Sequence, residues 1–153
     1  SLGASLMEFP PGDLDDELAQ AWVRSVAPVH ALVATTGAVA LAADKRLESA
    51  LDRTWTAVHA VAEALIAQEG AGKIVLLAPP PDAGQHAPAL RAAIENLART
   101  LSVEWARYAI SVTALTPGTS TSEDQTAAVV AFLLSPGGDY FSGCRLELGG
   151  LRS

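Results

Sequence analysis

The stretch that decides the fold is "HAPALRAAIENLARTLSVEWARYAISVTALTPG", residues 86–118. Its first part has the apolar spacing of a long helix that reaches Tyr108, and Pro88 suits a first helical turn. The apolar run 110–115 then has the length and composition of a buried strand, and Thr-Pro-Gly at 116–118 ends it. A helix that leads directly into a buried strand indicates an α/β unit.

The same alternation extends over the rest of the chain. Further helices are expected at 12–26, 47–70 and 122–135, and further strands at 4–9, 31–35, 73–78 and 144–148. Strands separated by helices predict a parallel sheet with right-handed crossovers, and runs such as "KIVLLA" are apolar enough to be covered on both faces. We therefore predict one domain over residues 1–153, an α/β, three-layer, Rossmann-like parallel sheet of about five strands, in which 4–9 pairs with 31–35.

The composition excludes several classes of function. The net charge of the 153 residues is −7, and no cluster of lysine and arginine marks a nucleic-acid or anionic-lipid surface. Cys144 is the only cysteine and the three histidines lack metal-ligand spacing, so neither a metal site nor an internal disulfide is expected. No apolar run reaches membrane-spanning length, and no signal-peptide pattern opens the sequence. These features predict a cytoplasmic protein, and its alanine, arginine and glycine content is typical of a GC-rich bacterial genome.

Three segments carry a resemblance to a known family: "GKIVLLA", "AAIENLARTLSVEWARYAISVTALTPG" and "AAVVAFLLSPGGDYFSGCRLELGG". Their order and spacing resemble the second part of the short-chain dehydrogenases/reductases, an extended family of NAD(P)-dependent oxidoreductases. Residues 13–71 match more weakly, through "HALVATTG" and the helix after it. Because family members are longer, the resemblance implies a chain truncated at its N-terminal side, without about the first two βα units, which hold the adenine half of the cofactor.

The departures from the family pattern concern its catalytic residues. Family enzymes carry Tyr-x-x-x-Lys, and alignment on "AAIENL" places the tyrosine slot on Ala87 and the lysine slot on Arg91. In the family the phenol donates a proton to a carbonyl, while the lysine lowers its pKa and holds the nicotinamide ribose. The helper serine slot falls on Pro79, and Asn96, the only asparagine, is not at the catalytic asparagine slot. No catalytic residue is therefore assigned.

The cofactor site of the family is also poorly matched. None of the twelve glycines fits the Gly-x-x-x-Gly-x-Gly turn on which a dinucleotide's pyrophosphate binds. The residual candidates on the nicotinamide side are Thr36 with Gly37 and Pro117 with Gly118. We expect no cofactor, and NAD(P) only if the family function survives.

Two other residues are pocket candidates. His86 stands beside the tyrosine slot and could act as an alternative acid or base, although a loop residue before the helix is the commoner reading. Arg91 could bind a phosphate or carboxylate, although an arginine on a helix more often pairs with an acid.

Two functions follow from this pattern. The first is a non-catalytic pseudoenzyme, a structural, assembly or regulatory subunit built on the dehydrogenase frame. The alternative is an oxidoreductase of the family with an atypical site, or one completed by a partner chain. We expect a homo-oligomer, a dimer or tetramer formed through helices 47–69 and 87–108, or a hetero-oligomer with a full-length homologue. The absent tyrosine, lysine and serine favour the first function.

Overall fold

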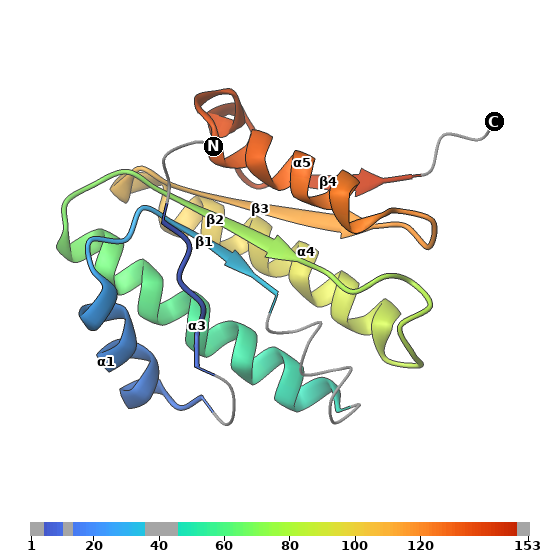
Figure 1. The fold of residues 1–153 in the computed structure, drawn as a ribbon, viewed down its shortest axis with the longest axis horizontal. Coiled ribbons are helices and arrows are strands. Elements are labelled where there is room, and N and C mark those ends of the chain that lie inside the picture. The colour runs from blue at the N-terminus through green and yellow to red at the C-terminus, as the bar shows by residue number, and fades with distance from the viewer. Residues whose placement is uncertain (1–4, 11–13, 36–45, 150–153) are drawn as a thin grey trace.

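A computed structural model describes residues 5–10, 14–35 and 46–149 of the chain (Figure 1). Helices and strands alternate as the sequence predicts. The elements are α1 (Asp16–Val26), β1 (Ala31–Ala34), α3 (Leu47–Ala67), β2 (Gly72–Leu77), α4 (Ala87–Glu104), β3 (Ile110–Pro117), α5 (Glu123–Leu134) and β4 (Arg145–Leu148), with short 3-10 helices at Ala106–Tyr108 and Pro136–Tyr140.

The strands form one parallel sheet in the order β1-β2-β3-β4. Leu32 is opposite Ile74, Val75 is opposite Thr113, and Leu115 is opposite Leu146. A parallel sheet with helices on its faces is the predicted Rossmann-like α/β architecture, and its four described strands are close to the expected five. Because every neighbouring pair is parallel, the carboxyl ends of all four described strands lie at the same edge.

The strand expected at 4–9 is the exception, because described residues 5–10 form no strand. Among the described strands, β1 pairs only with β2. The apolar residues of this segment find a different partner: the Phe9 ring lies 4.3 Å from the Trp22 ring of α1, whereas Leu6 and Met7 are exposed. The described contact of this segment is therefore an aromatic one with a helix, and residues 5–10 make no strand pairing.

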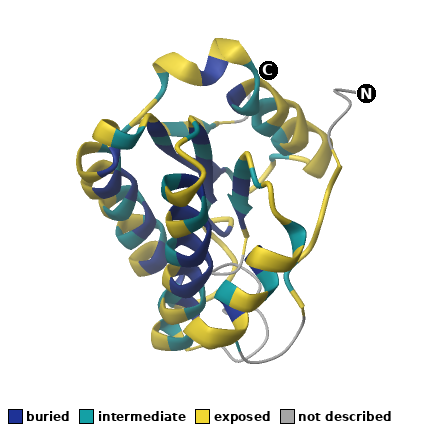
Figure 2. Ribbon diagram, turned by 90° about the vertical axis from the view of Figure 1, so that its left-hand side faces the viewer, coloured by how far each residue is buried: buried dark blue, intermediate teal, exposed yellow. Residues whose placement is uncertain are grey.

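The sheet separates two hydrophobic clusters of different size. α1, α3 and α4 cover one face, where Leu32, Ile74 and Val112 belong to the larger cluster (Figure 1). α5 covers the other face, where Val75 and Leu115 pack with Leu133. Figure 2 shows the strands as mostly buried between helices whose outer faces are exposed. No helix in the described part of the chain is long and apolar enough to cross a membrane.

The helix ends follow local capping rules. Asp15 caps α1, its carboxylate accepting a hydrogen bond from the Leu18 N–H at 2.8 Å. Ser122 and Gln125 form a reciprocal capping box at the start of α5. α4 ends at Glu104, earlier than predicted, and continues as a 3-10 turn up to Tyr108. Ala109 then adopts a left-handed conformation, with φ of 56°, which directs the chain into β3.

Candidate functional site

The positions that align with the family's catalytic residues meet at the carboxyl edge of the sheet. Pro79 follows β2, Pro117 ends β3, and Ala87 and Arg91 lie in the first turns of α4. This edge is where ligands bind in open α/β sheets. The sequence alignment therefore brings together residues that are neighbours in space.

Arg91 joins the ends of two strands to the helix. Its Nη1 donates hydrogen bonds to the carbonyl oxygens of Pro79 and Pro117, each at 2.7 Å. The side chain is only 15% exposed. A guanidinium keeps its charge in proteins and has five donors in a planar fork, so these bonds hold it in one orientation. The main partners of Arg91 are backbone oxygens, where the sequence predicted either an acid or an anion.

Ala87 has no exposed surface and belongs to the larger hydrophobic cluster. Its methyl group can neither donate a proton nor hydrogen-bond to a carbonyl substrate. Pro79 is also buried and contributes only a backbone oxygen, which Arg91 already occupies. Ala87 thus contributes to the hydrophobic core, and Pro79 contributes a carbonyl that accepts a hydrogen bond from Arg91.

The remaining predicted residues have separate surroundings. His86 precedes α4, and its Nε2 lies 3.2 Å from Nε2 of the Gln85 side chain. Gly118 joins β3 to β4: its N–H donates to the Leu148 carbonyl and to Thr121 Oγ1, both at 2.9 Å. A Cβ at Gly118 would lie 2.7 Å from that carbonyl, so close strand contact explains the glycine. Thr36 and Gly37 lie outside the described residues.

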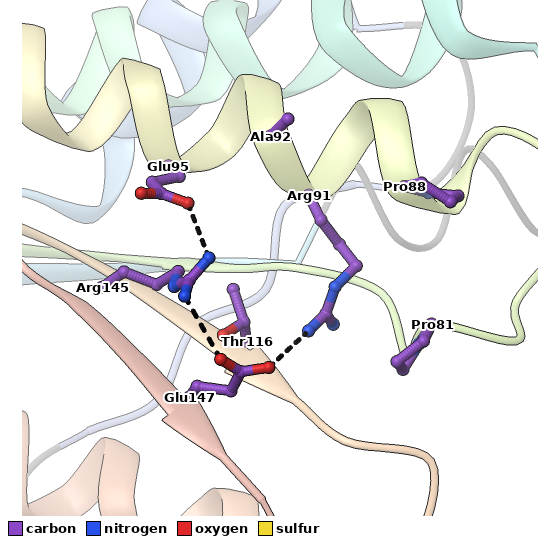
Figure 3. A pocket seen from close by; sticks show the side chains of 8 residues that line it. All are labelled: Pro81, Pro88, Arg91, Ala92, Glu95, Thr116, Arg145 and Glu147. Atoms are coloured by element: carbon purple, nitrogen blue, oxygen red, sulfur yellow. Dashed lines mark hydrogen bonds and ion pairs between the residues drawn. The ribbon is translucent and has the colours of Figure 1, made fainter.

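A cavity of about 290 Å³ opens beside Arg91, between α4, β3 and β4 (Figure 3). It is lined by Pro81, Pro88, Arg91, Ala92, Glu95, Thr116, Arg145 and Glu147. His86 is not among the lining residues, so the cavity does not support its role as an acid or base there.

Charged side chains alternate along one wall of this cavity. Arg145 donates from Nη1 to Glu95 at 2.9 Å and from Nη2 to Glu147 at 3.2 Å. Arg99, which does not line the cavity, donates to Glu95 at 2.7 Å from the exposed side. The other carboxylate oxygen of Glu147 lies 4.0 Å from Arg91 Nη2, an ion-pair distance that is too long for a hydrogen bond. The chain of charges links α4 to β4 and ends at Arg91.

Glu95, Arg145 and Glu147 are the site residues that sequence reasoning missed. The helical spacing in α4 and the alternation of side chains in β4 are the sequence signals that point to these residues. Positions 91, 95 and 99 lie on one face of α4, since residues four apart are neighbours on a helix. Positions 145 and 147 lie on one face of β4, since side chains alternate along a strand. Only the packing of α4 against β4 brings the two faces together.

A second cavity, of about 590 Å³, lies at the opposite edge, where the strands begin. Its most buried charge is Lys73, whose Nζ lies 2.5 Å from an Asp139 carboxylate oxygen and donates to the Ser135 carbonyl. Lys73 thereby fastens the end of α5 to the first residues of β2. Among the described residues, no three of His, Cys, Asp and Glu are placed to hold a metal ion.

No protein-family model and no curated protein matches the chain. Solved structures do match over most of its length. A citronellol catabolism dehydrogenase of Pseudomonas aeruginosa PAO1 is 26% identical with a TM-score of 0.67, and the match covers 89% of this chain and 69% of that one. A short-chain type dehydrogenase/reductase of Mycobacterium marinum is 15% identical with a TM-score of 0.70, covering 89% and 70%.

An acetoin dehydrogenase of Salmonella typhimurium gives a TM-score of 0.71 at 21% identity, covering 88% of this chain and 69% of that one. The chain has the short-chain dehydrogenase/reductase fold. The TM-scores establish the fold. Because the sequence identities are low, the chemistry has to be argued from the side chains of the site.

The nicotinamide chemistry associated with the short-chain dehydrogenase/reductase fold does not fit these side chains. A carbonyl reduction needs a proton donor beside the substrate, and Ala87 has none. In the family, the residue at the Arg91 position holds the cofactor's ribose, but Arg91 Nη1 is bonded to two backbone oxygens instead. Pro79, Ala87 and Arg91 thus supply no proton for reduction of a carbonyl at these positions.

Proposed function

We propose that the chain is a non-catalytic protein on the short-chain dehydrogenase/reductase fold, which acts as a structural, assembly or regulatory subunit. One observation carries this proposal: Arg91, at the position of the family's lysine, is committed to the backbone at the ends of β2 and β3. Arg91 consequently stabilises the sheet edge at which family enzymes perform their chemistry.

The neighbouring positions support the same reading. Ala87 is fully buried at the tyrosine position, and Pro79 at the serine position has no hydroxyl. General acid or base help typically accelerates a reaction by about 10²–10⁴-fold, so its absence removes most of a reductase's usual rate. Arg91 does not substitute for it, because a guanidinium does not release its proton in proteins.

An oxidoreductase completed by a partner chain is the second candidate. The solved structures that match include dehydrogenases, which favours this reading. Among the described strands, the outer edge of β1 is unpaired. A strand from another chain could pair there and add groups to the carboxyl edge.

A subunit role requires a surface for other copies or for a partner. We propose, as the sequence suggests, contact through α3 and α4. Much of their apolar surface is used inside the chain, since Val58, Leu65 and Leu101 are buried. Trp55 is 44% exposed and stacks on His59 at 5.4 Å, and it is the large side chain of α3 left for such a contact.

The experiment that tests the proposed function is a binding and turnover assay on the chain. We expect no saturable binding of NADH or NADPH at millimolar concentration and no reduction of small aldehydes and ketones. Turnover at ordinary enzyme rates that disappears in Arg91→Lys or His86→Ala would refute the non-catalytic assignment. Turnover that appears only after addition of a full-length homologue would instead support the composite oxidoreductase.

A further inference from the structure

Arg91 leaves part of its guanidinium facing the cavity. Nη1 is held by two backbone oxygens, while Nη2 has its nearest acid, Glu147, at 4.0 Å. Figure 3 shows the guanidinium directed toward Glu147 across the cavity. Because the two carbonyls fix its position, Nη2 is a preorganised donor that a ligand would not have to order.

Glu147 is poorly placed to satisfy both arginines. Its carboxylate bonds Arg145 Nη2 at 3.2 Å but stops at ion-pair distance from Arg91. Its side chain is 57% exposed. The backbone of β4 limits where the carboxylate can go, since Glu147 is held in register opposite Thr116. A free carboxylate has no such tether and can approach both guanidiniums at hydrogen-bond distance.

The charges that line the cavity balance one another. Arg91 and Arg145 carry two positive charges, Glu95 and Glu147 carry two negative ones, and Arg99 reaches Glu95 from outside the lining. Displacement of Glu147 into water would leave one positive charge in excess, which matches a monoanion.

We propose that this cavity binds a small monocarboxylate, with the carboxylate between Arg91 Nη2 and Arg145 Nη2 and Glu147 displaced. The carbon part of the ligand would contact Pro81, Pro88 and Ala92, which line the same cavity. Ligand pockets commonly have volumes of about 300–1,000 Å³, so a cavity of about 290 Å³ lies at the small end of the range and favours a small ligand. Glu147 acts as a tethered competitor that keeps the affinity of the wild-type chain low.

This inference goes beyond the proposed function and does not require catalysis. Binding would occur without nicotinamide cofactor, so its failure and the failure of the non-catalytic assignment are separate results. A carboxylate site on a non-catalytic frame would suit a regulatory subunit.

The test is an NMR titration of the intact chain with propionate, and with propionamide as the uncharged match. Glu147→Gln is expected to bind propionate about tenfold more tightly than the wild type, because it removes the competing charge. Arg145→Gln is expected to bind it at least about tenfold more weakly, because it removes one of the two donors. Both side chains are substantially exposed, so these variants are expected to fold.

Matched controls separate the site from general electrostatics. Glu104→Gln and Arg24→Gln make the same changes in net charge at other exposed positions, and both are expected to leave propionate binding unchanged. Amide shifts are expected to be largest at Ala92, Thr116 and Arg145. The proposal is overturned if Glu147→Gln fails to strengthen binding, if propionamide binds as well as propionate, or if inorganic phosphate binds more tightly than propionate.

Discussion

The Arg91 guanidinium is predicted to be the most stabilising charged group at the carboxyl edge of the sheet. The perturbation is Arg91→Met, which retains a long apolar stem and removes both hydrogen bonds to the backbone. The bonds to Pro79 and Pro117 are 2.7 Å long, and the side chain is 15% exposed. Both prolines are buried, so after loss of the arginine their carbonyls could find a new partner only in water that enters from the neighbouring cavity.

The expected loss follows from these two bonds. A hydrogen bond to a charged group typically contributes about 1.5–3 kcal/mol to stability. The two bonds share Nη1 and lie beside a cavity through which water can enter, so the lower end applies to each. Arg91→Met should therefore lower the free energy of unfolding by about 3 kcal/mol. That is a large part of the stability of an ordinary domain, about 5–15 kcal/mol.

Urea unfolding at pH 7, followed by circular dichroism, measures this loss as a lower midpoint at an unchanged slope. Arg99→Met is the matched control, because Arg99 lies on the same helix but is 67% exposed and pairs only with an acid at the surface. Its loss should be below about 1 kcal/mol. Hydrogen exchange should accelerate at the ends of β2 and β3 in the Arg91 variant. A loss for Arg91→Met no larger than that for Arg99→Met would refute the reasoning.

Two further predictions concern the helices. Ser122→Ala removes the side-chain half of the α5 capping box, in which Ser122 Oγ accepts from the Gln125 N–H at 3.1 Å, and should cost about 1 kcal/mol in urea unfolding; an unchanged midpoint would contradict the capping role. Trp55→Glu places a charge on the exposed outer face of α3, and light scattering should show the oligomeric mass of the wild type falling to the 15.8 kDa of one chain. A wild-type mass already at that value would argue against any oligomer.

Local sequence signals predicted the elements well, because short-range interactions determine them. Asp15, Ser122 and Gln125 act as helix caps within one turn of their partners, so no distant residue affects their role. The apolar runs in β2 and β3 predicted strands buried on both faces, and the structure places each between two layers of helices. The alternation of elements predicted the parallel sheet, since crossovers of this kind have few alternatives.

The prediction of a strand at 4–9 was wrong because contacts with distant residues decide the conformation of this segment. An apolar run of that length is compatible with a strand, but its register and partner depend on what else the residues can contact. Phe9 contacts the ring of Trp22, and residues 5–10 form no strand beside β1. Nothing in the local sequence distinguishes the two outcomes.

The sequence by itself determined which groups are present at the positions that align with the catalytic residues of short-chain dehydrogenases/reductases. Ala87, Pro79 and Arg91 could be placed there from the spacing of one helix and two strands, because these distances along the chain are set by regular geometry. It also determined the net charge and which residues can cap helices or fill the hydrophobic core.

Only the tertiary structure decided what Arg91 does and which charges surround it. The two carbonyls that it bonds belong to different strands, 12 and 26 positions away in the chain. Glu95 and Arg145 are separated by 50 positions and meet only because α4 packs beside β4. A long charged side chain has many possible partners of similar energy, so the packing of helices on the sheet, and not local sequence, selects among them.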